Sequence, residues 1–397
     1  MPTTRRAFLI GGVRAAVAAP FLPLLTRGVH DAGGERVLVV LQLTGGNDGL
    51  NTVVPHRQDE YYRLRPGLAV GRAELAPLDE DHGLHPALSG LARLFDAGEL
   101  AVVHGVGPPR PDRSHFRSMD VWHTADPDAP SGATGWLGRL ADQLAEREPV
   151  ALCALHVGDE DLPRALAGRT YFCPTVRSAE GFRLGEPAPG FKQARADLLA
   201  QTGGPADLAF LRAAARGTER AAERMQALAS RGSAAPYPDT ELARRLRLVA
   251  RLIAGGFGAR LFQLALGGFD THARQRGPHA ELLGTLGGAL AAFQADLAAS
   301  GASERVVTMV FSEFGRRAHE NGSGGTDHGA ASVAMALGEP VRGGLYGAPP
   351  ALDALDDGDL AFTTDFRSLY GALIDRVFGI PHQEVLGERF PLQSWLA

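Results

Sequence analysis

The 397-residue sequence contains little cysteine, little net charge and no internal repeat. Its two cysteines, Cys153 and Cys173, are too few for a disulfide-rich scaffold, and their spacing does not fit a zinc ribbon. They could form one disulfide in an oxidising compartment or remain two buried thiols, and both alternatives stay open. The net charge of −5, without a basic stripe interleaved with aromatic residues, argues against nucleic acid as a partner. A 45% share of hydrophobic residues is enough for a large core.

The N-terminal segment is only weakly apolar, which argues against a Sec signal or a membrane anchor. It runs TTRRAFLIGGVRAAVAAPFLPLL, with the pair Arg5-Arg6 near its start and Arg14 inside the apolar part. This pattern resembles a twin-arginine (Tat) export signal, which a translocase recognises as an address. The alternative is a chance arginine pair before an apolar helix. We interpret residues 1–34 as the export signal and linker, and residues 35–397 as one domain.

A signal of this kind implies the Tat translocase as a partner and the periplasm, or the outside of the cell, as the destination. Elsewhere in the chain we find no stretch that is long and apolar enough to span a bilayer. We therefore do not expect an integral membrane protein.

We predict that changing Arg5 and Arg6 together to lysine keeps the protein in the cytoplasm, because guanidinium and ammonium groups are not interchangeable for a receptor. Cell fractionation and immunoblotting measure the outcome. A variant with Thr3 and Thr4 changed to serine is the control and should be exported normally. Export of the double lysine variant at the normal rate would show that the segment is not a twin-arginine signal.

Apolar runs rich in β-branched residues alternate along the chain with segments whose apolar residues recur at helical spacing. This alternation predicts a three-layer α/β/α sandwich with a mostly parallel central sheet. The predicted strands are 35–43, 99–106, 150–158, 259–269 and 305–314, and the predicted helices are 85–98, 205–230, 239–255, 277–301 and one that begins after Asp365 as its N-cap.

Polar residues collect where the predicted strands end. In open α/β sheets ligands bind beyond the carboxyl ends of the strands, so side chains that follow different strands can meet there. In RVVTMVFSEFGRR, for example, an apolar run is followed by Glu313 and Arg316, which folding alone does not require. The candidate site residues are Asp48, Ser114, His115, Asp270, His272, Glu313, Arg316, Asp327 and His328.

Each of these motifs has an ordinary structural explanation when it is taken alone. GGND is typical of turns, Ser114 can cap a helix, and Glu313 can pair with Arg316. Their convergence favours a site, because several carboxylates at one sheet edge repel one another unless a cation balances them. Imidazole and carboxylate ligands together suit Zn²⁺ or Mn²⁺ better than Ca²⁺, so we predict one or two divalent ions. Three histidines outside these motifs are interpreted as structural: His104, His156 and His279.

Longer motifs carry a resemblance to a known family. LQLTGGNDGLNTVVP, RSHFRSMDVWHT, GFDTH, FSEFGRR, GTDHG, GGLYG and TTDFRSLY are similar to the exported bacterial family called domain of unknown function 1501 (DUF1501) over nearly the whole chain after the signal. The order of the acidic, serine and imidazole residues also resembles the alkaline phosphatase/sulfatase superfamily. This resemblance implies the α/β/α fold of that superfamily and a metal site at the strand ends.

The resemblance also implies roles for individual residues. Ser114 stands at the nucleophile position, His115 is a candidate acid or base or a hydrogen-bond partner of Ser114, and Arg316 could hold an anionic oxygen. The implied metal ligands, with Glu313 on a second ion, are Asp48, Asp270, His272, Glu313, Asp327 and His328.

Two functions remain in consideration. The first is an exported metal-dependent hydrolase that acts on phosphate or sulfate esters of small molecules or polysaccharides. The second is a non-catalytic secreted binding or assembly protein that retains the fold. The missing imidazole at Phe314 favours this second function, whereas the retained Ser114, Asp270, His272 and His328 favour the first.

Overall fold

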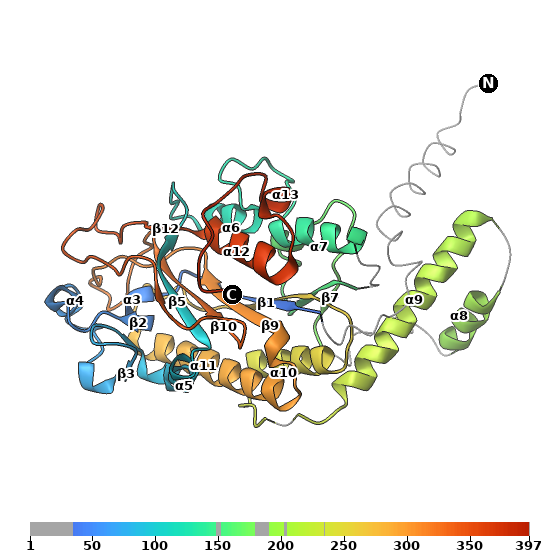
Figure 1. Ribbon diagram of the computed structural model, residues 1–397, viewed down its shortest axis with the longest axis horizontal. Helices are drawn as coiled ribbons and strands as arrows, with labels where there is room; N and C mark the ends of the chain where they lie inside the picture. The colour runs from blue at the N-terminus through green and yellow to red at the C-terminus, as the bar shows by residue number, and fades with distance from the viewer. Residues whose placement is uncertain (1–34, 148–151, 179–189, 202–204, 234, 397) are drawn as a thin grey trace, which may run out of the picture.

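A nine-stranded sheet forms the centre of the protein (Figure 1). The computed structural model describes residues 35–147, 152–178, 190–201, 205–233 and 235–396, so the proposed export signal lies outside the described residues. All five strands predicted from the sequence are present. They are β1 (Val37–Leu43), β5 (Leu100–Gly107), β6 (Ala154–Val157), β8 (Leu261–Leu266) and β9 (Val306–Ser312). Four are shorter than predicted, and β5 is shifted by one residue.

The strand order is β11-β5-β10-β9-β1-β8-β6-β7, and β12 pairs with β5. β1 is parallel to β8 and β9, and β6 is parallel to β8. β10 (Ser332–Leu337) is antiparallel to both β9 and β5, so β5 points the same way as β9. The carboxyl ends of the five predicted strands therefore share one edge of the sheet. This confirms the mostly parallel arrangement.

The sequence analysis missed four strands of this sheet. β10 has the sequence SVAMAL, in which the serine and two alanines give little local preference for a strand. The others are too short to show an alternating pattern. They are β7 (Thr175–Val176), β11 (Gly344–Tyr346) and β12 (Thr364–Asp365).

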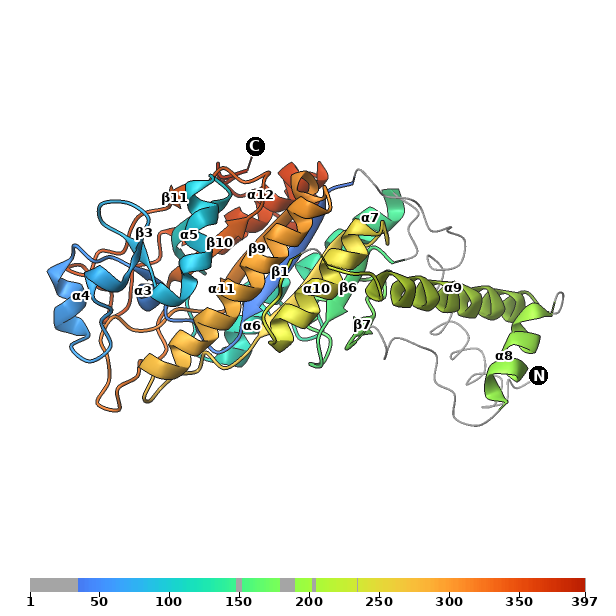
Figure 2. The same ribbon diagram turned by 90° about the horizontal axis from the view of Figure 1, so that it is seen from below.

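Helices cover both faces of the sheet (Figures 1 and 2). Val39 and Leu41 of β1 belong to one core cluster, and Leu38 and Val40 belong to the other. The first core is covered by α5 (Ser89–Asp96), α10 (Glu241–Ala254) and α11 (Arg276–Ala299). The second is covered by α6 (His115–Thr124), α7 (Trp136–Arg147), α12 (Phe366–Phe378) and α13 (His382–Leu386). The three predicted layers are therefore confirmed.

Further helices and a small second sheet lie outside these three layers. α8 (Phe191–Ala200) and α9 (Ala206–Ala229) project away from the sheet (Figure 2). Asp365 caps α12 as predicted, because its carboxylate accepts a hydrogen bond from the N–H of Arg367 at 2.9 Å. α3 (Gly49–Thr52) and α4 (Asp59–Leu64) accompany a small antiparallel sheet of β2 (Val53–Val54), β4 (Gly83–Leu84) and β3 (Ala76–Pro77).

Among the described residues, α11 alone is long and apolar enough to cross a membrane by length and composition. The expectation that no stretch after the N-terminus has this property is therefore wrong. Of the apolar window in α11, 56% is buried inside the protein. The helix packs against α10 and α5, and Leu286, Leu290 and Phe293 belong to the core. Core packing accounts for its composition.

Cys153 and Cys173 are buried free thiols in the structure. Burial raises the pKa of Cys153 to about 12 and also raises that of Cys173. Thiols that stay protonated are poor nucleophiles. The structure agrees with the second alternative, two buried thiols.

Candidate metal centre

Four side chains from different parts of the chain meet at the carboxyl edge of the sheet. Asp270 and His272 follow β8, His328 lies between β9 and β10, and His115 is the first residue of α6. Oδ1 of Asp270 is 3.1 Å from Nε2 of His272, 3.1 Å from Nε2 of His328 and 3.5 Å from Nε2 of His115. We call these four residues the His–Asp cluster.

Each imidazole of the cluster has an oxygen atom beside its other ring nitrogen, Nδ1. The three contacts are His115 with Oε1 of Glu313 at 3.0 Å, His272 with Oδ1 of Asp327 at 3.1 Å, and His328 with the carbonyl oxygen of Arg113 at 2.7 Å. Because these oxygens accept hydrogen bonds, a neutral ring carries its proton on Nδ1 and directs the Nε2 lone pair into the cluster. Outer contacts of this kind orient the histidine ligands of metal sites.

The inward-facing atoms repel one another unless a cation or a proton lies between them. Nε2 of His272 and Nε2 of His328 are 2.8 Å apart. Nε2 of His115 is buried and has no hydrogen-bond partner among the described residues. Ligand atoms of His115, Asp270 and His328 lie within 4.8 Å of one another, which one ion can bridge. Imidazole nitrogen and carboxylate oxygen are donors that zinc binds, so these residues fit a divalent ion.

Arg316 holds the loops of the site together. Its side chain is 0% exposed, and Nη2 donates to Oδ1 of Asp270 at 2.8 Å. Its nitrogens also donate to four backbone carbonyls, those of Gly45, Gly46, Phe269 and Thr326. The guanidinium is buried, and the anionic oxygen that it holds is Oδ1 of Asp270 within the protein.

Asp270 stays ionised beside this guanidinium. Burial raises the pKa of Asp270, but the hydrogen bond and the positive charge of Arg316 are among the effects that outweigh burial and lower that pKa to about 2. The side chains of Asp270 and His272 are 50% and 44% exposed. An anionic ligand group is therefore available at neutral pH and can be reached from solvent.

Glu313 supports His115 from inside the protein. Its Oε1 faces His115 and also accepts a hydrogen bond from the N–H of Gly45 at 2.8 Å. Gly45 has a φ of 115°, and a Cβ there would lie 2.4 Å from the backbone nitrogen of Asp270, so the close approach requires glycine. Asp327 similarly contacts His272 and Asn321. The contacts of Glu313 and Asp327 favour a role in orienting a histidine, and their predicted role as direct ligands stays a prediction.

Asp48 lies outside the cluster. Its Oδ1 accepts from the N–H of Asn51 at 3.2 Å, and its Oδ2 accepts from Nη1 of Arg65 at 2.5 Å and from Gln275. Burial raises the pKa of Asp48, but the charge and hydrogen bond of Arg65 lead the effects that lower it. Arg65 balances the charge of Asp48 without a metal, so we leave Asp48 out of the metal site.

Ser114 is the N-cap of α6, as expected for a helix start. It is exposed, and its hydroxyl makes no cap hydrogen bond to the helix. Its N–H donates to Oδ1 of Asp112 at 2.7 Å. The predicted role of His115 as acid, base or partner of Ser114 does not fit its contacts, because its two ring nitrogens face Glu313 and Asp270.

Two partners of the predicted site residues were missed in the sequence. The carbonyl oxygen of Arg113 belongs to the backbone, so no residue type reveals it. Arg65 looks like a surface charge in DEYYRLRP, yet it is fully buried. The order of strand ends could have identified His115 as a member of the cluster, since it follows β5 at the same edge as Asp270.

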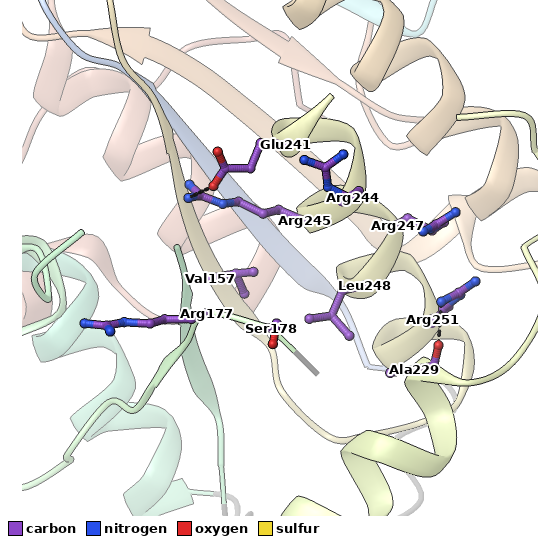
Figure 3. Close-up of a pocket in the computed structure, with 10 residues that line it drawn as sticks. All are labelled: Val157, Arg177, Ser178, Ala229, Glu241, Arg244, Arg245, Arg247, Leu248 and Arg251. Carbon is purple, nitrogen blue, oxygen red and sulfur yellow. Dashed lines mark hydrogen bonds and ion pairs between the residues drawn. The ribbon is translucent and has the colours of Figure 1, made fainter. Parts of the chain in front are cut away.

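A separate pocket of about 200 Å³ lies along α10 (Figure 3). The described residues that line it include five arginines: Arg177, Arg244, Arg245, Arg247 and Arg251. Arg245 forms ion pairs with Asp159, Glu160 and Glu241. None of the predicted site residues is among the described lining residues, so we place the candidate site at the His–Asp cluster.

The fold and the cluster define a three-layer α/β/α protein with a candidate metal centre at the carboxyl edge of its sheet. The family model described as "Protein of unknown function (DUF1501)" matches residues 109–388. The chain belongs to the DUF1501 family, as its motifs indicate. A comparison with curated proteins found no match.

Several solved structures are similar to this chain. The C-terminal periplasmic domain of EcEptC from Escherichia coli, in complex with Zn, is 10% identical with a TM-score of 0.37, over 80% of this chain and 77% of that chain. A protein in the alkaline phosphatase superfamily from Vibrio parahaemolyticus is 11% identical with a TM-score of 0.38, over 98% and 80%. The PsFucS1 sulfatase from Pseudoalteromonas sp. is 11% identical with a TM-score of 0.41, over 97% and 75%. Similarities this distant assign neither a metal nor a reaction.

We predict that Arg65→Met lowers the free energy of unfolding by roughly 3–5 kcal/mol, because it leaves the buried carboxylate of Asp48 without its partner. Urea unfolding measures the change. Arg63→Met is the matched control, since Arg63 is 71% exposed in its pair with Glu60 and should lose less than about 1 kcal/mol. Equal losses in the two variants would contradict the importance of the buried pair.

We predict that His272→Ala strongly weakens zinc binding and removes most of the rise in melting temperature that zinc produces. Asp327→Ala should weaken zinc binding by about 10–100-fold, since it removes only the acceptor that orients His272. Chelator competition and thermal unfolding measure both effects. His319→Ala, an exposed histidine on the same loop as Asp327, should bind zinc normally. Unchanged zinc affinity in His272→Ala would rule out this cluster as the metal site.

Proposed function

We propose that this protein is an exported metal-dependent hydrolase of phosphate or sulfate esters. The observation that carries the proposal is the His–Asp cluster, in which three Nε2 atoms and one carboxylate oxygen face one another. An acceptor beside each Nδ1 supports the inward direction of the lone pairs. A divalent ion held by these residues would polarise a phosphoryl or sulfuryl oxygen.

Ser114 is the proposed nucleophile. Its hydroxyl is exposed and is not used in capping α6, which has ten residues. The first N–H groups of a helix carry partial positive charge, so the start of α6 favours an anionic group beside Ser114. His115 ties this helix start to the cluster through Glu313 and Asp270. These contacts of the adjacent residue support a nucleophile close to the cluster.

The proposed reaction has two steps. Oγ of Ser114 forms a bond to the phosphorus or sulfur atom, the bond to the leaving oxygen breaks, and the serine proton ends on the leaving alcohol. Water then cleaves the new ester and releases phosphate or sulfate, which restores the serine hydroxyl. The exposed rim of the cluster suits a substrate that approaches from solvent.

A non-catalytic binding or assembly role is the second candidate, and the contacts of the acidic residues favour it. Two carboxylates expected to serve as metal ligands have other partners: Asp48 pairs with Arg65, and Glu313 contacts His115. Arg316 is buried and does not face a ligand. A single ion that only stabilises the fold is consistent with these contacts.

We predict that the protein loaded with Zn²⁺ or Mn²⁺ hydrolyses phosphate or sulfate esters, and that Ser114→Ala lowers kcat by roughly 10³-fold or more because the covalent nucleophile is lost. Metal affinity should be retained in this variant. Ser131→Ala, another exposed serine, is the control. Steady-state kinetics over both ester classes measures the outcome. Absence of turnover with every ester would favour the binding role, and an unchanged kcat in Ser114→Ala would exclude that serine as nucleophile.

A further inference from the structure

A cavity on the same sheet edge as the His–Asp cluster has no role in the proposed reaction. Its volume is about 120 Å³, and it lies between α3, the start of β10 and the segments 348–351 and 360–363. Leu50, Val53, Val333 and Leu360 form part of its apolar wall. The described residues that line it include no lysine, arginine or carboxylate, so the cavity suits an uncharged group.

One buried polar side chain interrupts this apolar wall. His104 lies near the carboxyl end of β5, lines the cavity and is 2% exposed. Its Nε2 is buried and has no hydrogen-bond partner among the described residues. The ring of His82 packs beside it at a centroid distance of 5.1 Å, and Nε2 of His82 also has no hydrogen-bond partner among the described residues. A buried ring nitrogen without a partner is costly, and a polar atom of a ligand in the cavity would satisfy it.

The protonation state of His104 agrees with an uncharged ligand. Burial lowers the pKa of His104 to about 4. The ring is therefore neutral at neutral pH, with one nitrogen that donates and one that accepts. A hydroxyl group can serve either nitrogen because it both donates and accepts.

The cavity and the cluster are linked through a single residue, Arg113. Its carbonyl oxygen accepts from Nδ1 of His328 at 2.7 Å. Its guanidinium donates to Oδ2 of Asp359 at 2.6 Å, and Asp359 precedes Leu360 in the cavity wall. In addition, β5 and β10, which supply His104 and Val333 to the wall, are the two strands that follow β9 in the sheet order. The cavity and the cluster are therefore built on neighbouring segments of the same sheet edge.

We propose that this cavity binds an uncharged, ring-sized apolar group carrying one hydroxyl, which forms a hydrogen bond with His104. The size follows from the volume, because an apolar cavity of roughly 150 Å³ takes up benzene. The interpretation of this group as the apolar end of an ester substrate rests on the proposed hydrolase function. The binding of the group itself does not depend on turnover. His104, interpreted from the sequence as structural, becomes a positioning residue for the ligand.

The test uses the protein with phenol as the probe, and NMR titration measures binding. Toluene matches phenol in size but has no hydroxyl, and benzoate carries a charge. We expect phenol to bind and benzoate not to bind. Toluene should bind about tenfold more weakly than phenol, because one hydrogen bond contributes about this factor to the affinity. In His104→Leu, phenol should weaken to the level of toluene while toluene binding is retained.

A second variant keeps the test valid if His104→Leu folds poorly. Ala361 lines the cavity and is exposed, so Ala361→Trp should block it and abolish binding of both phenol and toluene. Ala354→Trp places the same side chain at an exposed position outside the described lining and should bind both probes normally. Phenol binding that survives both His104→Leu and Ala361→Trp, or no phenol binding to the parent protein, overturns the proposal.

Kinetics separates this proposal from the proposed function. If phenol binds as expected and no ester is hydrolysed, the cavity assignment stands and the hydrolase fails. If esters are hydrolysed and phenol does not bind, the cavity assignment fails and the hydrolase stands. If both hold, Ala361→Trp should raise KM for aryl esters about tenfold with little change in kcat, because the cavity contributes binding and not chemistry.

Discussion

The guanidinium of Arg316 aligns the loops that build the candidate site. It is fully buried, bonds to carbonyl oxygens of the segments after β1 and β8 and of the segment before Asp327, and contacts Asp270. A buried charge of this kind is stable only when its donors are paired, so these loops cannot separate without a large loss of stability. Arg316 therefore fixes Asp270 from the inner side. The three imidazoles face the same oxygen of Asp270, Oδ1, that Arg316 holds.

The direction of the strands explains why distant residues meet there. β1, β5, β8 and β9 end at one edge, and this edge collects Gly45, His115, Asp270 and Glu313. His115 and Glu313 are 198 residues apart in the sequence, yet their side chains are in contact. The sheet thus supplies the geometry, and the short polar motifs after each strand supply the chemistry.

Part of the site could be predicted from the sequence. The gathering of Asp270, His272 and His328 followed from apolar runs that end in polar motifs, because strand direction determines where such motifs lie. The roles of Asp48, Glu313 and Arg316 could not be predicted, since each depends on partners brought close only by folding. Fold elements show the same limit: long apolar strands were predictable, whereas β10, with its small residues, takes its place from pairing with β9 and β5.

Anomalous X-ray diffraction from crystals of the protein soaked in zinc tests the central claim most directly. The account predicts one strong zinc peak bonded to Nε2 of His115, His272 and His328 and to a carboxylate oxygen of Asp270, each at about 2 Å. Glu313, Asp327 and the carbonyl oxygen of Arg113 should keep their contacts with the Nδ1 atoms. The absence of a peak at the cluster, or a peak bonded instead to Asp48 or to Nδ1 atoms, would contradict the account.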